Sequence, residues 1–337
     1  MTVINYPSQK WIWFLSFFLK LGVYVYGAGV VIIWWILHYW GDEWWFATIL
    51  LYGPHWIYLL PLIFLLPMAI LWARRLLLPL IAITILIVWQ IMGFTVSLPR
   101  KDNPGASKLR VVTYNVQRWE VSGQEFSNLL ETIRPDILAV QECASPRSLK
   151  IPPPWHVKAS MNSIVVSRFP IIESTVIKRG YDTSGLYCII ETPKGPVGFC
   201  CVDLLTPRRA LTHVLDRNKI FNLGSVDIAD QGIENRWTES EKLFKWLKGV
   251  GDEKIIAGDF NLTVDSNIYR KYWSNYQNAF NQIGFGFGYT KKTTINIFRY
   301  RSRIDHILST PQFRPVRTWM GPDFGADHLP LVVEFEY

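Results

Sequence analysis

Ile255-Ile256-Ala257-Gly258-Asp259-Phe260-Asn261 is the stretch from which the organisation of this chain is best understood. Its apolar residues predict the end of a buried strand, and Gly258 allows a tight exit. On an extended backbone Asp259 and Asn261 would face one pocket, while Phe260 anchors the opposite side. A carboxylate beside an amide suits the activation of a water near a phosphate. Because Asp and Asn also end strands simply to cap turns, this stretch alone leaves the chemistry open.

The first 99 residues differ in composition from the rest of the chain. Only four of the 35 basic residues and two of the 27 acidic residues lie there. Three apolar stretches, residues 11–38, 44–73 and 76–98, are each long enough to cross a hydrocarbon core of about 30 Å. We therefore predict a membrane anchor of about three transmembrane helices in residues 1–99. A polar linker, residues 100–108, follows it.

The charged residues of the predicted loops indicate an orientation. Lys10 and Arg74-Arg75 lie on one side of three spans, and Asp42-Glu43 lies on the other. The positive-inside rule places the basic side in the cytoplasm. We therefore expect a multi-pass protein of the cell membrane whose domain after residue 99 lies outside the cytoplasm. A re-entrant middle stretch, which contains three prolines, would leave two spans and reverse this orientation.

Net charge and cysteine content set only loose bounds. The formal net charge of +8 suits an anionic substrate or a membrane surface, and equally an ordinary basic domain. The four cysteines show no CxxC spacing, so no zinc site is expected. Buried free thiols are the simplest interpretation, and a disulfide between Cys188 and Cys200 stays open. The sequence leaves the oligomeric state open as well.

Residues 109–337 predict strands with interspersed helices. A helix is expected over residues 124–133, with Phe126, Leu129, Leu130 and Ile133 on one face. A second helix is expected over residues 238–247, opened by a capping box of Thr238 and Glu241. Strands are expected at residues 109–116, 137–140, 163–167, 187–191, 197–202, 255–259, 303–308 and 332–335. This mixture without a repeated unit predicts an α/β or α+β sandwich.

Polar residues that suit catalysis follow several of these strands. They are Asn115, Glu142, Asp259 with Asn261, Asp305 with His306, and Asp327-His328 ahead of the last strand. In layered α/β domains the polar groups at strand ends meet at one edge of the sheets. Each residue has an ordinary structural explanation of its own. Together they predict a functional site.

With these motifs the chain resembles the endonuclease/exonuclease/phosphatase superfamily over about residues 108–337. The resemblance rests on Thr113-Tyr114-Asn115-Val116, residues 136–142 (DILAVQE), residues 167–171 (SRFPI), Gly258-Asp259-Phe260-Asn261, residues 303–308 (RIDHIL) and Asp327-His328, in the family's order. It implies an α/β fold, a four-layer sandwich of two mixed β-sheets flanked by helices. Here an N-terminal transmembrane segment would precede that sandwich, as in membrane-anchored bacterial members.

The resemblance also implies a role for each site residue. Glu142 would be the principal ligand of Mg²⁺, or of Mn²⁺, with contributions from Asn115 and Asp327. Asp259 would orient or deprotonate the attacking water, and Asn261 would hold the nucleophile or a phosphate oxygen. His328 would donate to the phosphoryl oxygens, with Asp305 orienting its imidazole.

One position departs from the family pattern. Many members carry a His on the strand that here reads residues 198–207 (GFCCVDLLTP), and the matching position holds Asp203. Asp203 could be a general acid with a raised pKa, an extra metal ligand, or the mark of a weakened enzyme. Arg208 and Arg209 follow and could restore positive charge near the phosphate or belong to a solvated loop. Arg303 is a further expected substrate-binding residue.

The combined hypothesis is a membrane-tethered, divalent-metal-dependent phosphoesterase, with a phosphodiester favoured as substrate. In-line attack of water would release the alcohol. The expected partners are the lipid bilayer and a phosphate ester in a nucleic acid or a phospholipid head group. The alternative is a non-catalytic module that binds a phosphorylated ligand or partner, which the Asp203 replacement favours.

Overall fold

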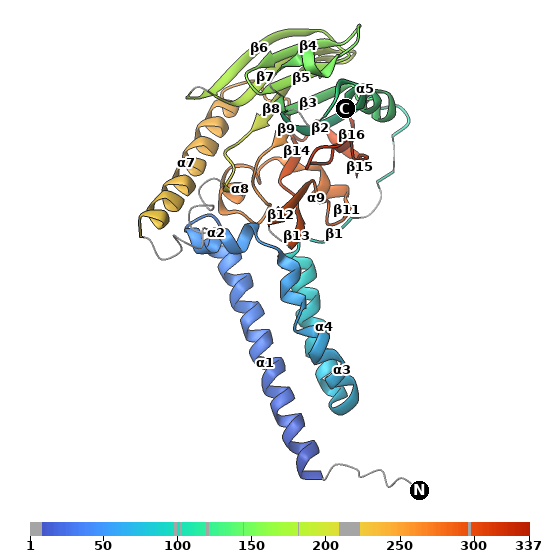
Figure 1. Ribbon diagram of the computed structural model, residues 1–337. Helices are drawn as coiled ribbons and strands as arrows, with labels where there is room; N and C mark the ends of the chain where they lie inside the picture. Colours follow the sequence, from blue (N-terminus) through green and yellow to red (C-terminus); the bar gives the residue numbers. More distant parts are fainter. Residues whose placement is uncertain are drawn as a thin grey trace.

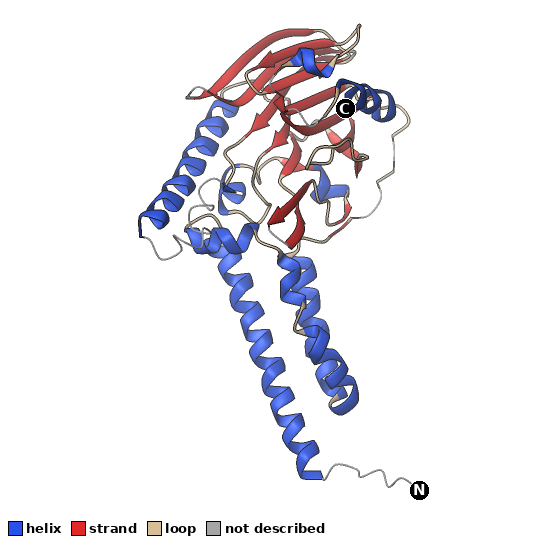
Figure 2. Cartoon of the chain, viewed as in Figure 1, coloured by secondary structure: helices blue, strands red, loops and turns tan. Residues whose placement is uncertain are grey.

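The structure is a computed structural model that describes residues 9–97, 100–101, 103–118, 121–143, 145–180, 182–208, 223–295 and 298–337. A helical N-terminal part extends from one end of an α/β domain (Figure 1). Figure 2 shows that the strands are confined to the domain and that helices make up the extension. The two parts meet around α2 (Trp45–Tyr52).

The N-terminal part consists of helical segments joined by short turns. In chain order they are α1 (Gln9–Trp40), α2, η1 (His55–Leu59), α3 (Leu62–Trp72), η2 (Arg74–Leu76), α4 (Leu77–Leu86) and the π-helical η3 (Ile87–Ile91). Three stretches are long and apolar enough to cross a membrane: Trp13–Trp40, His55–Trp72 and Arg74–Ile91. The prediction of three such stretches is confirmed.

Apolar side chains cover the outside of these helices as well as their contacts with each other. Leu19, Leu62 and Leu80 are buried where α1, α3 and α4 pack together. Phe64 and Leu78 point outward and are 72% and 76% exposed. A helix that is apolar all round is typical of a membrane span, because lipid tails can cover the outer face.

The domain is built on two mixed six-stranded sheets. Sheet 1 runs in the spatial order β15 (Arg314–Met320), β16 (Leu331–Glu336), β2 (Lys108–Arg118), β3 (Ile137–Cys143), β5 (Ser163–Ser167) and β4 (His156–Ser160). Sheet 2 runs β10 (Gln277–Asn278), β14 (Asp305–Ser309), β9 (Lys254–Asp259), β8 (Gly195–Asp203), β7 (Asp182–Thr192) and β6 (Ile171–Arg179). The pairs β2–β3 and β8–β9 are parallel, and the other pairs are antiparallel.

Helices cover the outer face of each sheet and complete four layers. Sheet 1 is covered by α5 (Gly123–Ile133) and η4 (Pro146–Leu149), and sheet 2 by α7 (Leu223–Lys248) and α8 (Asn267–Tyr272). The remaining elements are α9 (Ala279–Ile283), the pair β1 (Thr95–Val96) and β11 (Phe285–Gly286), and the hairpin β12 (Lys291–Ile295) and β13 (Phe298–Ser302). The predicted α/β fold of two mixed sheets flanked by helices is confirmed.

The alternation along β9 shows how the sequence builds these layers. Ile255 and Ala257 are buried between the two sheets, whereas Ile256 faces the helices outside sheet 2. Successive side chains in a strand point to opposite faces, so Asp259 continues the inner face. A Cβ on Gly258 would lie 2.0 Å from the carbonyl oxygen of Val202, so only glycine allows β8 and β9 to approach here.

The two predicted helices had different outcomes. The helix over residues 124–133 is confirmed as α5, and Ser122 with Glu125 forms a capping box at its start. The predicted start at Thr238 is wrong, because α7 begins at Leu223 and Thr238 lies inside it. Buried Ala229 and Ile233 give the upstream turns their own contacts with the domain, and this packing extends the helix beyond the local capping signal.

Candidate active site

Three aspartates lie side by side at the end of sheet 2. In the strand register Asp203 of β8 is opposite Asp259 of β9, and Asp259 is opposite Asp305 of β14. Each belongs to an alternation whose other members, such as Phe199, Ala257 and Ile307, are buried between the sheets. The three carboxylates therefore face sheet 1 at one edge of the sandwich.

Asn115 connects the two sheets at this edge. Its amide Nδ2 donates to Asp259 Oδ2 at 3.0 Å and to Glu142 Oε1 at 3.1 Å. Along β3 the residue before Glu142 already faces inward, so strict alternation would turn Glu142 outward. A φ of 52° at Glu142, in the left-handed region, breaks that alternation. The backbone strain at Glu142 thus accompanies its placement beside Asn115.

His328 precedes β16 and is held from both ring nitrogens. Its Nδ1 donates to Asp305 Oδ2 at 2.8 Å, and its Nε2 lies 2.9 Å from Lys291 Nζ and 3.7 Å from Asp259 Oδ2. Burial lowers the pKa of His328, but the adjacent Asp305 carboxylate outweighs it and raises the pKa above the usual range. Burial likewise acts to raise the pKa of Asp305, but the charge of His328 and the hydrogen bond from its Nδ1 bring that pKa below its usual value.

The turn after β9 holds Asn261 differently from the sequence-based expectation. The strand ends at Asp259, and Asn261 takes a left-handed φ of 50°, so the predicted extended backbone is wrong here. Its backbone N–H donates to Asp259 Oδ1 at 2.8 Å, and its Nδ2 donates to the carbonyl of Leu204 at 2.9 Å. Phe260 does anchor the opposite side, where it is buried against Trp273.

Asp203 is buried at the margin of this group. Its Oδ2 accepts a hydrogen bond from Asn162 Nδ2. Burial, together with the charges of Asp259 and Glu142, raises the pKa of Asp203 well above that of an ordinary aspartate. Burial and the charge of Asp305 similarly raise the pKa of Asp259 to about 7. The site therefore concentrates more negative charge than the protein alone neutralises.

The donor set at this edge fits a divalent cation. Ligand atoms of Asp259, Asp305 and His328 lie within 4.8 Å of one another. Among the described residues, Asp305 Oδ1 and Asp327 Oδ1 are buried and have no hydrogen-bond partner. Buried carboxylate oxygens normally have partners, and hard oxygen donors are the ligands preferred by Mg²⁺. A cation held here would give such an oxygen a partner.

Comparison with known proteins agrees with this geometry. The family model described as Endonuclease/Exonuclease/phosphatase family matches residues 112–328, more than half of the chain. The chain belongs to the endonuclease/exonuclease/phosphatase family. Its matched region begins in β2 and ends at His328, so it contains every catalytic and metal-binding residue proposed from the sequence.

Several solved structures resemble this family member in fold. A 3′ phosphatase from Neisseria, bound to a product DNA hairpin, shares 17% identity with a TM-score of 0.49; the alignment covers 68% of this chain and 100% of that one. An AP endonuclease from Archaeoglobus fulgidus shares 16% identity over 67% and 99% of the two chains, with a TM-score of 0.48. A mannosyl-6-phosphatase from Bacteroides thetaiotaomicron shares 16% identity over 68% of this chain and 100% of that one, with a TM-score of 0.46. No curated protein matches the chain.

The structure brings together most of the residues expected from the family resemblance. Asn115, Glu142, Asp259, Asp305 and His328 are linked by the contacts above. Asp327 also lies at this edge, and its Oδ2 forms an ion pair with Lys291 Nζ at 2.5 Å. Asn261 donates its backbone N–H to Asp259, whereas its side-chain amide donates to the carbonyl of Leu204.

Of the three expected substrate-binding arginines, Arg303 lies apart from this group. Arg303 is buried near the helical N-terminal part, where its guanidinium lies 4.7 Å from the ring centroid of Phe280 and 3.4 Å from Thr95 Oγ1. Arg208 is exposed, and its backbone N–H donates to Thr206. Arg209 lies outside the described residues.

Sequence reasoning gave no catalytic role to Lys291 or Gln117. The Nζ of Lys291 contacts both Asp327 Oδ2 and His328 Nε2. The backbone of Gln117 has a left-handed φ of 47°. Its N–H donates to Asn115 Oδ1, and its side-chain Oε1 accepts from the N–H of Asp327. Its position two residues after Asn115 was the only available signal.

Proposed function

We propose that this chain is a membrane-tethered, divalent-metal-dependent phosphoesterase that acts by preference on a phosphodiester. The observation that carries the proposal is the convergence of Asp259, Asp305 and His328 within 4.8 Å, next to the Asn115–Glu142 pair. Membership of the endonuclease/exonuclease/phosphatase family supports the same chemistry. The buried oxygens without partners at Asp305 and Asp327 support the requirement for a cation.

The site residues suit in-line displacement at phosphorus. Asp259 would accept a proton from the attacking water. The oxygen of that water would bond to phosphorus while the ester P–O bond breaks. His328, oriented through Nδ1 by Asp305, would donate to a phosphoryl oxygen from Nε2. Glu142, with Asn115 and Asp327, would hold Mg²⁺ or Mn²⁺. Such a cation would neutralise charge that develops on the phosphoryl group.

The proposed tether places the catalytic domain at a membrane surface. In Figure 1 the domain lies at the end of α1 that leads into α2. The turn between α3 and α4, which contains Arg74-Arg75, lies at the opposite end of the apolar stretches. The positive-inside rule would put that basic turn in the cytoplasm. The catalytic domain would then act outside the cytoplasm, on a nucleic acid or a phospholipid head group.

The decisive experiment measures hydrolysis of bis-(p-nitrophenyl) phosphate by the full-length protein in a neutral detergent. We expect turnover with Mg²⁺ or Mn²⁺, none in EDTA, and none in the Asp259→Ala variant. An Asp323→Asn variant, whose carboxylate is 58% exposed, is the matched control and should keep its activity. A folded protein that neither turns over nor binds Mg²⁺ by calorimetry would contradict the enzyme proposal. It would favour a phosphate-binding module, the reading that Asp203 supports.

A further inference from the structure

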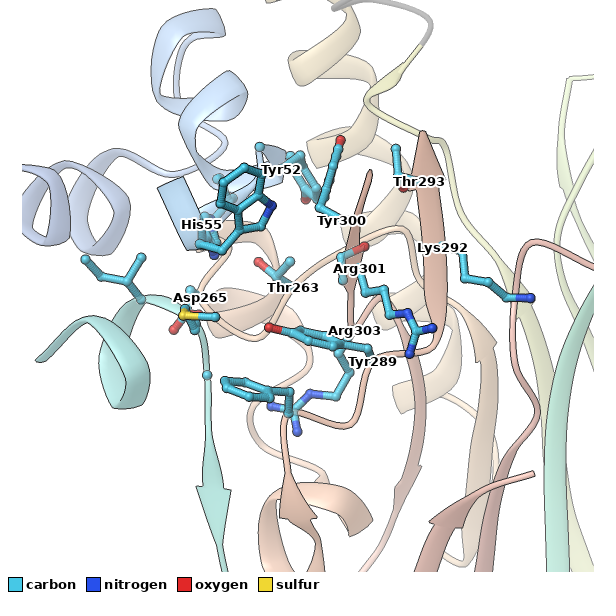
Figure 3. A pocket seen from close by; sticks show the side chains of 18 of the residues that line it. Tyr52, His55, Thr263, Asp265, Tyr289, Lys292, Thr293, Tyr300, Arg301 and Arg303 are labelled. Atoms are coloured by element: carbon cyan, nitrogen blue, oxygen red, sulfur yellow. The ribbon is translucent and has the colours of Figure 1, made fainter. Parts of the chain in front are cut away.

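A cavity of about 610 Å³ lies where the helical N-terminal part meets the catalytic domain (Figure 3). One wall comes from the turn after α2 and from the end of the third apolar stretch, including Tyr52, Trp56 and Ile91. The opposite wall comes from the β12–β13 hairpin, including Arg301, and from Arg303 directly after it. In Figure 3, Tyr52 and His55 lie above Tyr289 and Arg303, with the space between them.

The cavity is strongly basic on the domain side. Lys292, Arg299, Arg301 and Arg303 line it, and Asp265 is the acidic residue among its lining side chains. Lys292 is already paired with Asp323. Among the described residues, no carboxylate lies within 4 Å of the three arginine side chains. An anionic group would therefore meet an excess of positive charge here.

Arg303 is the lining residue that most requires an anionic partner. Its exposed fraction is only 7%, and its sole hydrogen bond within the described part of the chain is the 3.4 Å contact with Thr95. Burying a guanidinium without a close ion pair is costly. Burial lowers the pKa of Arg303, and the charge of Asp265, which forms no ion pair within 4 Å in the described part of the chain, does not offset this effect. Thr263 adds a second unsatisfied group, because its Oγ1 is buried beside the cavity without a partner in the described residues. Both groups match the acceptor oxygens of a phosphate.

The other side of the cavity is apolar and lies at the ends of the spans. Leu51, Trp56, Ile91 and Met92 line it. Phe287 also lines it and packs on Phe94, just after the third apolar stretch, at a centroid distance of 4.9 Å. Neighbouring Phe285 is 75% exposed at the same level. Aromatic residues at the ends of spans are typical of the membrane–water interface.

The cavity is also close to the catalytic residues along the chain. Thr263 follows Asn261 by two residues, and Lys292 directly follows Lys291, whose Nζ contacts His328. The two segments that carry catalytic groups therefore continue into the cavity wall. Lys291 and Lys292 are consecutive in β12 and point to opposite faces, so the cavity and the catalytic site lie on the two sides of this strand.

We propose that this cavity binds the phosphate head group of an anionic membrane lipid, whose acyl chains stay in the bilayer beside the spans. This inference rests on the membrane tether of the proposed function and goes beyond that function, because Asp259, Asp305 and His328 are not among the residues that line the cavity. A nucleic acid would also meet the basic wall, but it would leave the apolar wall at the ends of the spans without a partner.

Lipid binding is tested separately from turnover by native mass spectrometry of the full-length Asp259→Asn variant in detergent micelles with Mg²⁺. The micelles contain dioleoyl phosphatidylglycerol or dioleoyl phosphatidylcholine at equal mole fractions. We expect at least tenfold stronger retention of phosphatidylglycerol, and at least tenfold loss of that retention when Arg303→Gln is added. Arg301→Gln should also weaken retention, and it removes an exposed side chain without disturbing the core. Arg317→Gln, on exposed β15, is the matched control and should change nothing.

Thr263→Val keeps the experiment informative if Arg303→Gln does not fold. The substitution removes a hydroxyl that has no protein partner, so the fold should survive while phosphatidylglycerol retention falls several-fold. Equal retention by all variants would overturn the proposal, since it would mean that the lipid binds around the spans. Displacement of the lipid by glycerol 3-phosphate or by a thymidine octanucleotide at matched concentration would also overturn it, in favour of a soluble phosphate ester or a nucleic acid. Absent hydrolysis of the small diester would instead count against the proposed function alone.

Discussion

Asp42 and Arg236, 194 positions apart in the chain, form an ion pair in which both side chains are almost completely buried. Asp42 lies in the loop after α1, and Arg236 lies on α7 of the catalytic domain. Arg236 also donates to Tyr52 Oη at 2.6 Å and to the carbonyl of Asn261 at 2.9 Å. The N-terminal part is therefore connected through one guanidinium to the turn that follows Asp259.

The first prediction concerns this connection. Asp42→Asn leaves the Arg236 charge buried without its counter-ion, which costs about 3–5 kcal/mol in comparable sites. We expect a lower unfolding temperature in detergent and a reduced kcat, because the carbonyl of Asn261 loses its fixed donor. Thermal unfolding and steady-state kinetics of the full-length protein measure both effects.

The control for this prediction is Glu241→Gln, which breaks the exposed Glu241–Lys245 pair on the same helix. Exposed pairs contribute little, so it should leave stability and kcat nearly unchanged. The double variant Asp42→Asn with Arg236→Met removes both charges and should recover part of the stability. If Asp42→Asn behaves like Glu241→Gln, the ion pair does not hold the catalytic turn.

The second prediction concerns the orientation of His328. Asp305→Asn keeps the shape of the side chain but removes the carboxylate that accepts from Nδ1. We expect kcat to fall by about 10²-fold or more while KM changes little, because the imidazole loses its fixed tautomer and direction. Asp323→Asn is again the control. A raised KM with unchanged kcat would show that Asp305 serves substrate binding instead.

Much of this site was predictable because strand alternation and motif order are local. The apolar run before Asp259 and the polar residues after the other strands predicted the edge where they meet. Asn115 and Asp305 lie at the edge where this reasoning, together with the family resemblance, expected them. Local patterns determine which face of a strand a residue occupies, and the faces suffice to bring these two groups together. Alternation alone would have turned Glu142 outward, so its place at this edge came only from the family resemblance.

Contacts between distant segments were not predictable in this way. Asp42 was treated as a charge in a loop, whereas it is buried against a helix almost two hundred residues later. Arg303 was expected to bind substrate, and its position in the junction cavity, directly after β13, could not be predicted from the sequence. The left-handed turns at Glu142 and Asn261 were also missed, since neither residue is a glycine that would mark such a turn.

The third prediction concerns the thiols. All four cysteines are buried and free in the structure, which decides against the disulfide left open by the sequence. Burial raises the pKa of Cys188 and that of Cys201 to about 12. We expect no reaction with Ellman's reagent at pH 8 in the folded protein. After denaturation without a reducing agent, four thiols should react. Finding only two after denaturation would mean that a disulfide forms.

The fourth prediction tests Asp203 as the group that protonates the leaving alcohol. Asp203→Asn keeps an oxygen that can accept from Asn162 but removes the acidic proton. A p-nitrophenolate leaving group needs no proton, whereas an alkoxide does. We therefore expect a loss in kcat of about 10²-fold or more on a dialkyl phosphodiester and little change on bis-(p-nitrophenyl) phosphate. Equal losses on both substrates, with weaker Mg²⁺ binding by calorimetry, would identify Asp203 as a metal ligand; unchanged rates on both would leave it no catalytic part.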